Sequence, residues 1–297
     1  MPGKNPDLPI EDVRRLFEHW GDVTAEPRGV DYSEVDAGGV SALWAIPKGG
    51  ASDRVLQATH GGGYVVGSPY NHRKLFGHIA KVVGVPVLII DYRRAPEHLH
   101  PAPVEDAVRS YQWLLAEGFQ PEKIGLIGDS AGGALAVTTL LLLRERGLPL
   151  PAASVPLSPW TDLLVTGPSV VSNHEKDHFV KRHVIDHLSS VYLGDDGTSV
   201  ARRDPLASPL YADLAGLPPL YVQVGGDETL LDDAARLVDA ARAAGVEVKY
   251  DVYPEQQHVF HFLAGSAPEA NQAVQDIAQW LRPRLGLSWE EHRIAAE

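Results

Sequence analysis

A serine occupies the point where a predicted strand turns directly into a predicted helix. Residues 128–132 read Gly-Asp-Ser-Ala-Gly, between an apolar run at 123–128 and a long apolar run at 131–146. A Gly-x-Ser-x-Gly turn in this setting raises the serine hydroxyl above a sheet, and its small flanking residues let strand and helix approach closely. An incidental serine in a glycine-rich turn would give the same letters, so the flanking elements carry the inference. Ser130 is therefore a candidate nucleophile.

Three consecutive glycines follow an earlier predicted strand, within the sequence His-Gly-Gly-Gly-Tyr at 60–64. Such a run costs backbone entropy and is tolerated mainly where the backbone must approach another group closely. The spacing does not match phosphate-binding loops, and no Lys-Ser or Lys-Thr pair follows. We therefore expect an oxyanion hole, in which the N–H groups of Gly61, Gly62 and Ala131 face the oxygen of a tetrahedral intermediate. His60 would orient the loop rather than act as a base.

A general base is expected downstream of the serine. In an α/β sheet with a serine at such a turn, the acid and then the histidine follow along the chain. His258 lies in a loop after a predicted strand at 246–252, at the sheet edge where active sites collect. His261 lies three residues farther on, and His292 lies in a charged tail. We therefore expect His258 to be the base.

Two adjacent carboxylates follow the predicted strand at 220–224. Asp227 and Glu228 would point in different directions, so only one of them could contact the imidazole. The acid has to hold one tautomer of the histidine and stabilise the imidazolium that forms. Spacing alone leaves both residues open for this role.

A second histidine motif indicates different chemistry. His174, Glu175 and His178 match the His-Glu-x-x-His pattern of zinc hydrolases. That site needs both imidazoles on one face of a helix, a third ligand and a protected, mostly apolar setting. The two intervening residues are charged, and His183 and His187 are the further histidines that could contribute. We expect a solvated segment here rather than a metal site.

Short β-branched runs alternate with longer helical patterns from about residue 54 onward. The predicted strands are residues 54–59, 85–91, 123–128, 153–157, 220–224 and 246–252. The predicted helices are residues 75–83, 104–115, 131–146, 230–244 and 267–285. Alternation of this kind joins parallel strands by helical crossovers. The sequence therefore predicts an α/β fold with a mostly parallel central sheet and helices on both faces.

Two regions depart from this alternation. The N-terminal region predicts a helix at 9–20 and a hairpin of two strands, 30–35 and 40–46. Residues 160–205 lie between two core strands and are polar and rich in histidine. An insertion of that size usually covers a face or a pocket of the sheet. We therefore expect a single domain over residues 1–297 with an added cap rather than two domains.

Composition narrows the chemistry and the partners. The chain of 297 residues carries 26 Lys and Arg against 39 Asp and Glu, a formal net charge of −13. An acidic surface without a basic stripe repels phosphate backbones, so nucleic acid is not expected as a partner. The chain has no cysteine, which excludes disulfides, thiolate nucleophiles and cysteine-ligated metals. A charged N-terminus and no apolar run long enough to cross a bilayer predict a cytoplasmic protein without membrane insertion.

Several ordered motifs together resemble the hormone-sensitive-lipase-like family of bacterial esterases. They are HGGG at 60–63, DYR at 91–93 with APEH at 95–98, GDSAGG at 128–133 and HVF at 258–260. The resemblance implies the α/β-hydrolase fold with a helical cap, formed by about residues 1–35 and the insertion at 160–205. It also implies that no cofactor is needed.

The resemblance bears on the choice of the acid. Family members carry the acid in a pattern like Asp-Pro-Leu-x-Asp-Glu. Residues 228–233, Glu-Thr-Leu-Leu-Asp-Asp, align with this pattern and place Glu228 where the acid stands. Thr229 then stands in the place of the proline, which keeps Asp227 open although the register favours Glu228.

The resemblance implies a serine carboxylesterase that acts on short- to medium-chain acyl esters or lactones through Ser130, Glu228 and His258. Its partners would be small ester molecules, and a free edge strand near 246–252 would allow a homodimer. A catalytically silent small-molecule receptor on the same fold is one alternative, although a receptor is expected to have a broken triad. A zinc-dependent hydrolase that uses the motif at 174–178 is the other.

Overall fold

The computed structural model describes residues 9–194, 198 and 200–288. Within this part of the chain, eight strands form one sheet in the order β1-β2-β4-β3-β5-β6-β7-β8. The strands are β1 (Val30–Asp36), β2 (Ser41–Pro47), β3 (Val55–Thr59), β4 (Val87–Ile90), β5 (Ile124–Asp129), β6 (Ala153–Leu157), β7 (Leu220–Gly225) and β8 (Val248–Tyr253). The pairs β1–β2 and β2–β4 are antiparallel, and the remaining pairs are parallel. The expected α/β class with a mostly parallel sheet is confirmed.

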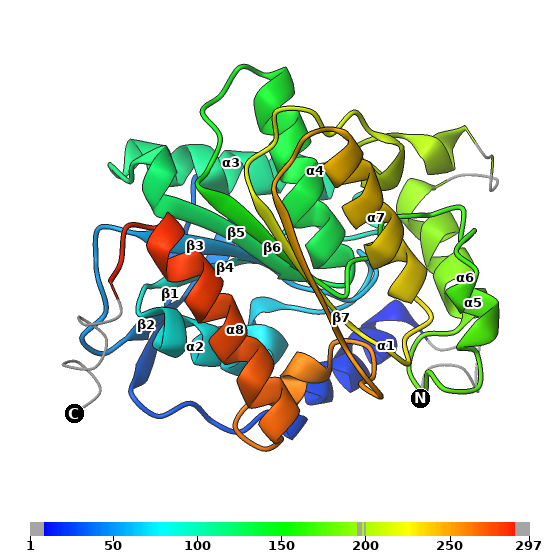
Figure 1. The fold of residues 1–297 in the computed structure, drawn as a ribbon, viewed down its shortest axis with the longest axis horizontal. Coiled ribbons are helices and arrows are strands. Elements are labelled where there is room, and N and C mark those ends of the chain that lie inside the picture. The colour runs from blue at the N-terminus through cyan, green and yellow to red at the C-terminus, as the bar shows by residue number, and fades with distance from the viewer. Residues whose placement is uncertain (1–8, 195–197, 199, 289–297) are drawn as a thin grey trace.

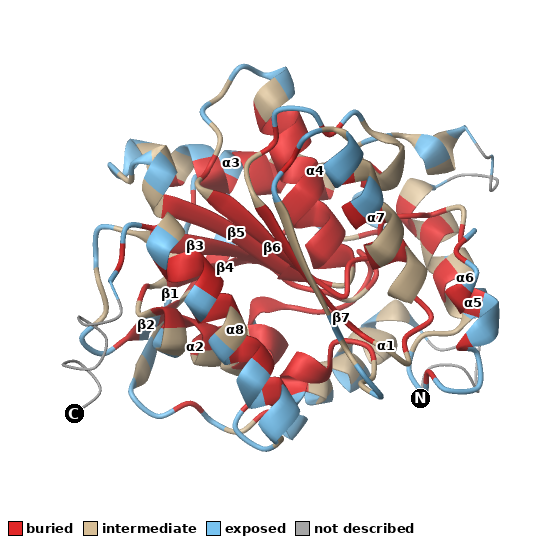
Figure 2. Cartoon of the chain, in the orientation of Figure 1, coloured by how far each residue is buried: buried red, intermediate tan, exposed pale blue. Residues whose placement is uncertain are grey.

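The central strands are buried on both faces. β3, β4, β5, β6 and β7 consist of buried residues only, which matches their nearly continuous apolar sequences. The two edge strands, β1 and β8, are only partly buried. Figure 2 shows this buried interior between helices whose outer sides are exposed.

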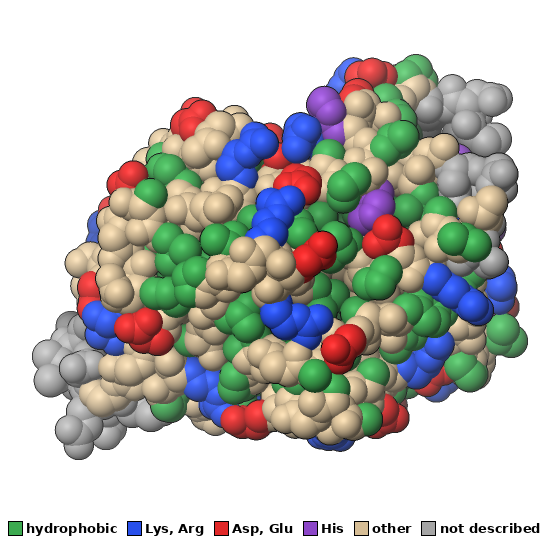
Figure 3. All heavy atoms as spheres, turned by 90° about the horizontal axis from the view of Figure 1, so that it is seen from above, with side chains coloured by type: hydrophobic (Ala, Val, Ile, Leu, Met, Phe, Trp, Pro, Cys, Tyr) green, Lys and Arg blue, Asp and Glu red, His purple; other side chains and the backbone are tan. Residues whose placement is uncertain are grey.

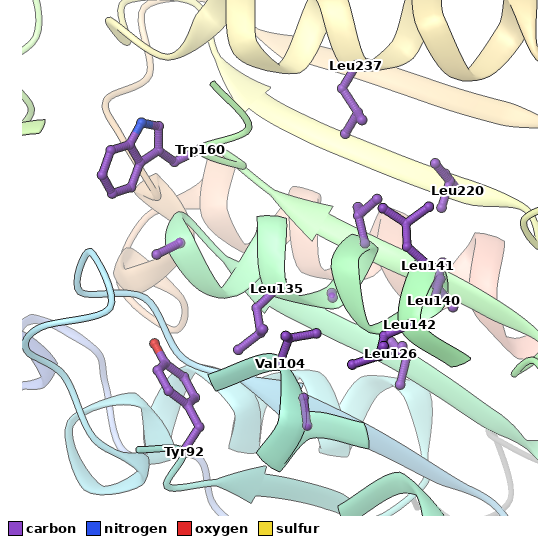
Figure 4. Packing of buried hydrophobic residues seen from close by; sticks show 14 of the residues in the cluster. Tyr92, Val104, Leu126, Leu135, Leu140, Leu141, Leu142, Trp160, Leu220 and Leu237 are labelled. Atoms are coloured by element: carbon purple, nitrogen blue, oxygen red, sulfur yellow. The ribbon is translucent and has the colours of Figure 1, made fainter. Parts of the chain in front are cut away.

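Five long helices cover the two faces of the sheet. They are α2 (Pro69–Val83), α3 (Ala102–Ala116), α4 (Ala131–Glu145), α7 (Leu231–Ala243) and α8 (Pro268–Arg284). The buried side chains of α2 and α8 pack in one cluster, and those of α3, α4 and α7 pack in another. Figure 1 shows α2 and α8 on the side of the sheet opposite to α3 and α4. Figure 4 shows leucines of α4 between Val104 of α3 and Leu237 of α7. This packing fixes α4, and with it the serine that precedes its first residue.

The cap limit expected at residue 35 is wrong, because residues 30–35 belong to the sheet. β1 pairs with β2 from Val30 to Asp36, and β2 pairs in turn with β4. The expected hairpin therefore forms, but it extends the sheet instead of covering a pocket. Any N-terminal part of a cap ends before Val30, and residues 1–8 lie outside the described residues.

The chain between β6 and β7 forms an insertion in which helices alternate with turns and irregular segments. It contains α5 (Ser169–Ser172), α6 (Arg182–Leu193), and the short 3-10 helices η4 (Ala201–Arg203) and η5 (Pro209–Tyr211). The insertion runs from residue 158 to 219, so it is longer than the expected 160–205. Residues 195–197 and 199 of the insertion are not described. The sequence does not predict α6 as one helix, because exposed histidines interrupt its apolar pattern. Ile185 and Tyr192 nevertheless give it a buried face.

The N-terminal helix lies beside the insertion at one end of the sheet. α1 (Ile10–Glu18) is followed by a 3-10 helix, η2 (His19–Val23). Apolar side chains of α1 and α6 pack around Val65 and Val66, in the loop that follows β3. The Trp20 ring meets the Phe179 ring edge-on, with centroids 4.8 Å apart. Figure 1 shows α1, α5 and α6 gathered on the right-hand side of the molecule.

Three features of the surface relate to the expected partners: membrane-spanning helices, the distribution of charge and the open edge of the sheet. No helix in the described ranges is long and apolar enough to cross a membrane. On the face shown in Figure 3, acidic and basic side chains are interspersed rather than gathered by sign. β8 leaves a sheet edge open, where Lys249 and Asp251 form an ion pair of 3.1 Å. A homodimer through this edge stays a prediction.

Candidate active site

Ser130 lies in the sharp turn between β5 and α4. Its backbone angles, φ 55° and ψ −121°, are strained for a residue that carries a side chain. The Ser130 N–H donates to the Leu157 carbonyl at the end of β6 (2.8 Å), and the Ser130 carbonyl accepts from the Trp160 N–H (3.0 Å). The turn therefore has the strain expected where a nucleophile is raised above a sheet.

The two glycines that flank the serine are required by space. A Cβ atom at Gly128 would lie far inside van der Waals contact with the Gly132 carbonyl oxygen. A Cβ atom at Gly132 would collide in the same way with the Thr59 carbonyl oxygen at the end of β3. The Gly-x-Ser-x-Gly spacing is therefore imposed by the close approach of β3, β5 and α4.

The structure brings Glu228 and His258 together, although 30 positions separate them in the chain. His258 Nδ1 lies 2.8 Å from Glu228 Oε2. The other carboxylate oxygen, Oε1, accepts hydrogen bonds from Ser158 Oγ and the Gly225 N–H, both at 2.6 Å. Glu228 is fully buried, so these three partners account for both of its oxygens.

The neighbouring carboxylate, Asp227, faces another way. Its Oδ1 accepts from Lys176 Nζ at 3.2 Å, and the two side chains are 23% and 58% exposed. Of the two carboxylates left open by the sequence, Glu228 is the one that contacts the imidazole. Both residues lie after the end of β7, and of the two only Glu228 is buried with its carboxylate against the imidazole.

The environment of His258 favours its charged form. Burial lowers the pKa of His258, the charge and hydrogen bond of the adjacent Glu228 carboxylate raise it, and the net result is a raised pKa. The charges of Asp177 and Asp129 act in the same direction. With Nδ1 donating to Glu228, Nε2 is the ring nitrogen left to accept a proton.

In the loop after β3, one of the expected oxyanion donors is already hydrogen-bonded to another residue. The Gly61 N–H donates to Asp129 Oδ1 at 3.0 Å, so it is committed inside the protein and the expectation for Gly61 is wrong. The N–H groups of Gly62 and Gly63 have no hydrogen-bond partner among the described residues, and both glycines have positive φ, 116° and 61°. Ala131 opens α4, where N–H groups have no partner within the helix. Gly63 is thus a residue that the sequence reasoning missed, although it is the third glycine of the same run.

Comparisons with known proteins agree with this geometry. The family model described as alpha/beta hydrolase fold matches residues 56–262. The crystal structure of an esterase from the bacterial hormone-sensitive lipase family superimposes with a TM-score of 0.91 at 45% sequence identity, covering 95% of this chain and 94% of that chain. The chain belongs to the hormone-sensitive-lipase-like family of α/β-hydrolases.

The names of two relatives agree with the expected enzyme class. An acetyl-hydrolase of Streptomyces hygroscopicus is 39% identical over 295 residues, covering 93% of this chain and 97% of the relative. An esterase of Acinetobacter venetianus is 36% identical over 221 residues, covering 74% of this chain and 72% of the relative. The expected α/β-hydrolase fold is confirmed, and so is the class of carboxylic ester hydrolase.

Two residues that the sequence reasoning missed hold this hydrolase's site together. Ser158 directly follows β6, and its Oγ donates to Glu228 and accepts from the Val259 N–H (3.2 Å), so it joins the acid to the histidine loop. Asp129 directly precedes Ser130 and fastens the glycine loop through Gly61. Both contacts join distant segments of the chain, so sequence spacing carries no signal for them.

The other histidines near the site have structural surroundings. His261 is buried, its Nε2 lies 2.9 Å from Gln223 Oε1, and burial lowers its pKa to about 3. His60 stacks on Tyr92 with ring centroids 4.2 Å apart, and its Nδ1 lies 2.8 Å from the Gly61 carbonyl oxygen. His60 therefore shapes the glycine loop, and burial lowers its pKa well below the usual value. His292 lies outside the described residues.

The zinc alternative is wrong for the described part of the chain. Residues 174–178 lie in turn and irregular structure beyond the end of α5, so His174 and His178 do not share a helix face. Both side chains are exposed, as are His183 and His187 on α6. The described residues contain no group of three or more His, Cys, Asp or Glu arranged to hold a metal ion.

Proposed function

We propose that this hydrolase is a serine carboxylesterase whose triad is Ser130, His258 and Glu228. The observation that carries the proposal is the buried Glu228–His258 pair, with 2.8 Å between Oε2 and Nδ1. A chain of contacts supports the grouping, because Ser130 bonds to Leu157 and the next residue, Ser158, bonds to Glu228. A receptor that has lost turnover would not need this arrangement, so we favour the enzyme.

The proposed reaction is acyl transfer through the serine. Ser130 Oγ attacks the ester carbonyl carbon while His258 Nε2 takes the hydroxyl proton, and Glu228 stabilises the imidazolium through Nδ1–H. When the tetrahedral intermediate collapses, the proton passes to the leaving alkoxide and an alcohol departs. Water then attacks the acyl-enzyme by the same route and releases the carboxylic acid. The chain's own residues supply every group in this sequence, so we propose no cofactor.

The oxyanion of the intermediate would be held by backbone donors. We propose the N–H groups of Gly62, Gly63 and Ala131 for this role, with Gly61 removed from the original set. The N–H groups of Gly62 and Gly63 are unpaired among the described residues, and the N–H of Ala131 lies in the first turn of α4. Preorganised donors of this kind stabilise the charge that develops in the transition state.

Short- to medium-chain acyl esters or lactones are the proposed substrates. The relative of 39% identity is named an acetyl-hydrolase, which supports a small acyl group. The insertion lies over the glycine loop, because a Cβ atom at Gly63 would lie 2.6 Å from Leu188 Cδ1 of α6. This contact supports a cap made of the N-terminal region before Val30 and the insertion at 158–219. The cytoplasmic location stays a prediction.

The test of the proposal is hydrolysis of p-nitrophenyl butyrate by the wild type and by Ser130→Ala. We expect turnover by the wild type and none above background by the variant, because the hydroxyl is the proposed nucleophile and adds little to packing. Circular dichroism checks that both proteins are folded. A folded Ser130→Ala variant that still hydrolyses the ester would refute the serine mechanism.

A further inference from the structure

A buried carboxylate from the insertion contacts the residue that follows the acid of the proposed triad. Asp177, in the segment 174–178 that the zinc motif had singled out, is fully buried. Its Oδ2 accepts the N–H of Thr229 (2.8 Å) and the Thr229 hydroxyl (3.1 Å). Its Oδ1 accepts the N–H groups of Phe179 and Val180, both at 2.8 Å. Asp177 therefore uses four donors, and two of them belong to the residue next to Glu228.

Thr229 is the position at which the chain departs from the Asp-Pro-Leu pattern. A proline there would have no N–H to donate and no hydroxyl. The contact with Asp177 therefore depends on the residue that this chain carries. The hydrogen bonds that Thr229 donates to the Asp177 carboxylate are also stronger than bonds to a neutral acceptor would be, because hydrogen bonds to an ionised oxygen are about twice as strong.

The insertion holds the same stretch of backbone at two further points. Asn173 Nδ2 donates to the Glu228 carbonyl oxygen at 2.8 Å. Ser169 Oγ donates to the Thr229 carbonyl oxygen at 2.7 Å. The backbone of the acid is thus fixed from the insertion, while its carboxylate is fixed from β6 and β7 by Ser158 and Gly225.

A glutamate has more need of such support than an aspartate. Its side chain has one more rotatable bond, so its carboxylate loses more conformational freedom when it is held in one place. Fixing the backbone on one side and the carboxylate on the other leaves few ways for Oε2 to move away from His258.

We propose that Asp177 is a positioning residue for the Glu228–His258 pair: by holding the N–H and hydroxyl of Thr229, it fixes the backbone from which Glu228 reaches the imidazole. This inference rests on the proposed triad. The insertion then does more than cover the pocket, because it takes part in setting the geometry of the base. Asp177 does not touch the ester in this account and acts only through Glu228 and through its charge.

The test compares Asp177→Asn with a matched control, Glu175→Gln. Glu175 lies in the same segment, carries the same charge, and its side chain is 97% exposed. We expect Asp177→Asn to lower kcat on p-nitrophenyl butyrate by about 10- to 100-fold with little change in KM, because a misplaced group loses transition-state stabilisation. Glu175→Gln should match the wild type.

The pH dependence separates positioning from a purely structural role. The charged or titratable groups that act on His258 are Glu228, Asp177, Asp129 and His261. Removing the charge of Asp177 should lower the pKa of His258, so the acidic limb of the kcat/KM profile should move to lower pH. A structural role would lower the melting temperature but leave kcat of the folded enzyme and this limb unchanged.

Each outcome decides the matter. If Asp177→Asn is folded and keeps the wild-type kcat and acidic limb while Ser130→Ala is inactive, the positioning role is refuted and the serine mechanism stands. If Ser130→Ala is active, the proposed function itself fails. If circular dichroism shows that Asp177→Asn does not fold, Thr229→Val decides. It removes the hydroxyl, which reaches Asp177 and the Val180 carbonyl oxygen, and keeps the N–H bond to Asp177. We expect a fall in kcat of about threefold. A folded Thr229→Val enzyme with unchanged kcat would then overturn the proposal.

Discussion

Replacing Glu228 by glutamine keeps the shape of the acid and changes what one of its two terminal atoms can do. Oε1 accepts from Ser158 Oγ and from the Gly225 N–H, and the latter is a fixed donor. The amide oxygen of glutamine must therefore take the Oε1 position, because an NH2 group there would face the Gly225 N–H. The NH2 group is left facing His258 Nδ1, 2.8 Å away.

This orientation imposes the wrong tautomer on His258. Nδ1 has to accept from the amide, so the ring proton moves to Nε2, which can then no longer take the proton of Ser130. We expect kcat to fall by about 10⁴-fold, or roughly 5 kcal/mol of transition-state stabilisation. The adjacent substitution Asp227→Asn is the control, since among the described residues the Asp227 carboxylate bonds only to the half-exposed Lys176. It should change kcat by less than about twofold.

Saturation kinetics on p-nitrophenyl butyrate measure both variants, with circular dichroism as the check on folding. Two results would refute the reasoning. An Asp227→Asn enzyme that loses as much kcat as Glu228→Gln would give the role of the acid to Asp227. A folded Glu228→Gln enzyme that keeps more than a tenth of the wild-type kcat would show that the tautomer of His258 is not set by this carboxylate.

Two further predictions concern the Glu228–His258 pair. Ser158→Ala leaves Glu228 Oε1 with one donor and the Val259 N–H unpaired, so urea unfolding should show a free energy of unfolding lower by about 1.5–3 kcal/mol. The control Ser154→Ala removes a buried hydroxyl that has no partner among the described residues, and it should not lower the free energy of unfolding. Equal losses in the two variants would contradict the role given to Ser158. Because the pKa of His258 is raised and the neutral ring is the active form, kcat/KM should fall on acidification through a midpoint above about 6.5. A midpoint that stays in place in Glu228→Gln would contradict the assignment.

The sheet, the turn at Ser130 and the loop position of His258 could be predicted because their signals are local. Buried parallel strands are continuous apolar runs, and β6 is found at the predicted residues 153–157. Ser130 sits in a turn whose glycines are demanded by backbone contact, and His258 follows the last strand of the sheet. Each of these features depends on residues that are neighbours in the chain.

The remaining features depend on contacts between distant segments. Gly61 could not be separated from Gly63 by sequence, because the Gly61 N–H is occupied by Asp129, 68 positions away. Ser158 and Asp177 act on Glu228 and Thr229 across 70 and 52 positions. The sequence does not predict α6, because exposed histidines interrupt its apolar pattern and its buried face is defined by packing within the insertion.

The central claim is that Ser130 is the nucleophile, and covalent trapping tests it most directly. A p-nitrophenyl phosphonate ester should react with Ser130 Oγ and release p-nitrophenol, and peptide mass spectrometry after digestion locates the adduct. We expect one adduct per chain, on the peptide that contains Ser130, absent in Ser130→Ala and formed far more slowly in Glu228→Gln. An adduct on another residue, or none on a preparation that hydrolyses p-nitrophenyl butyrate, would contradict it.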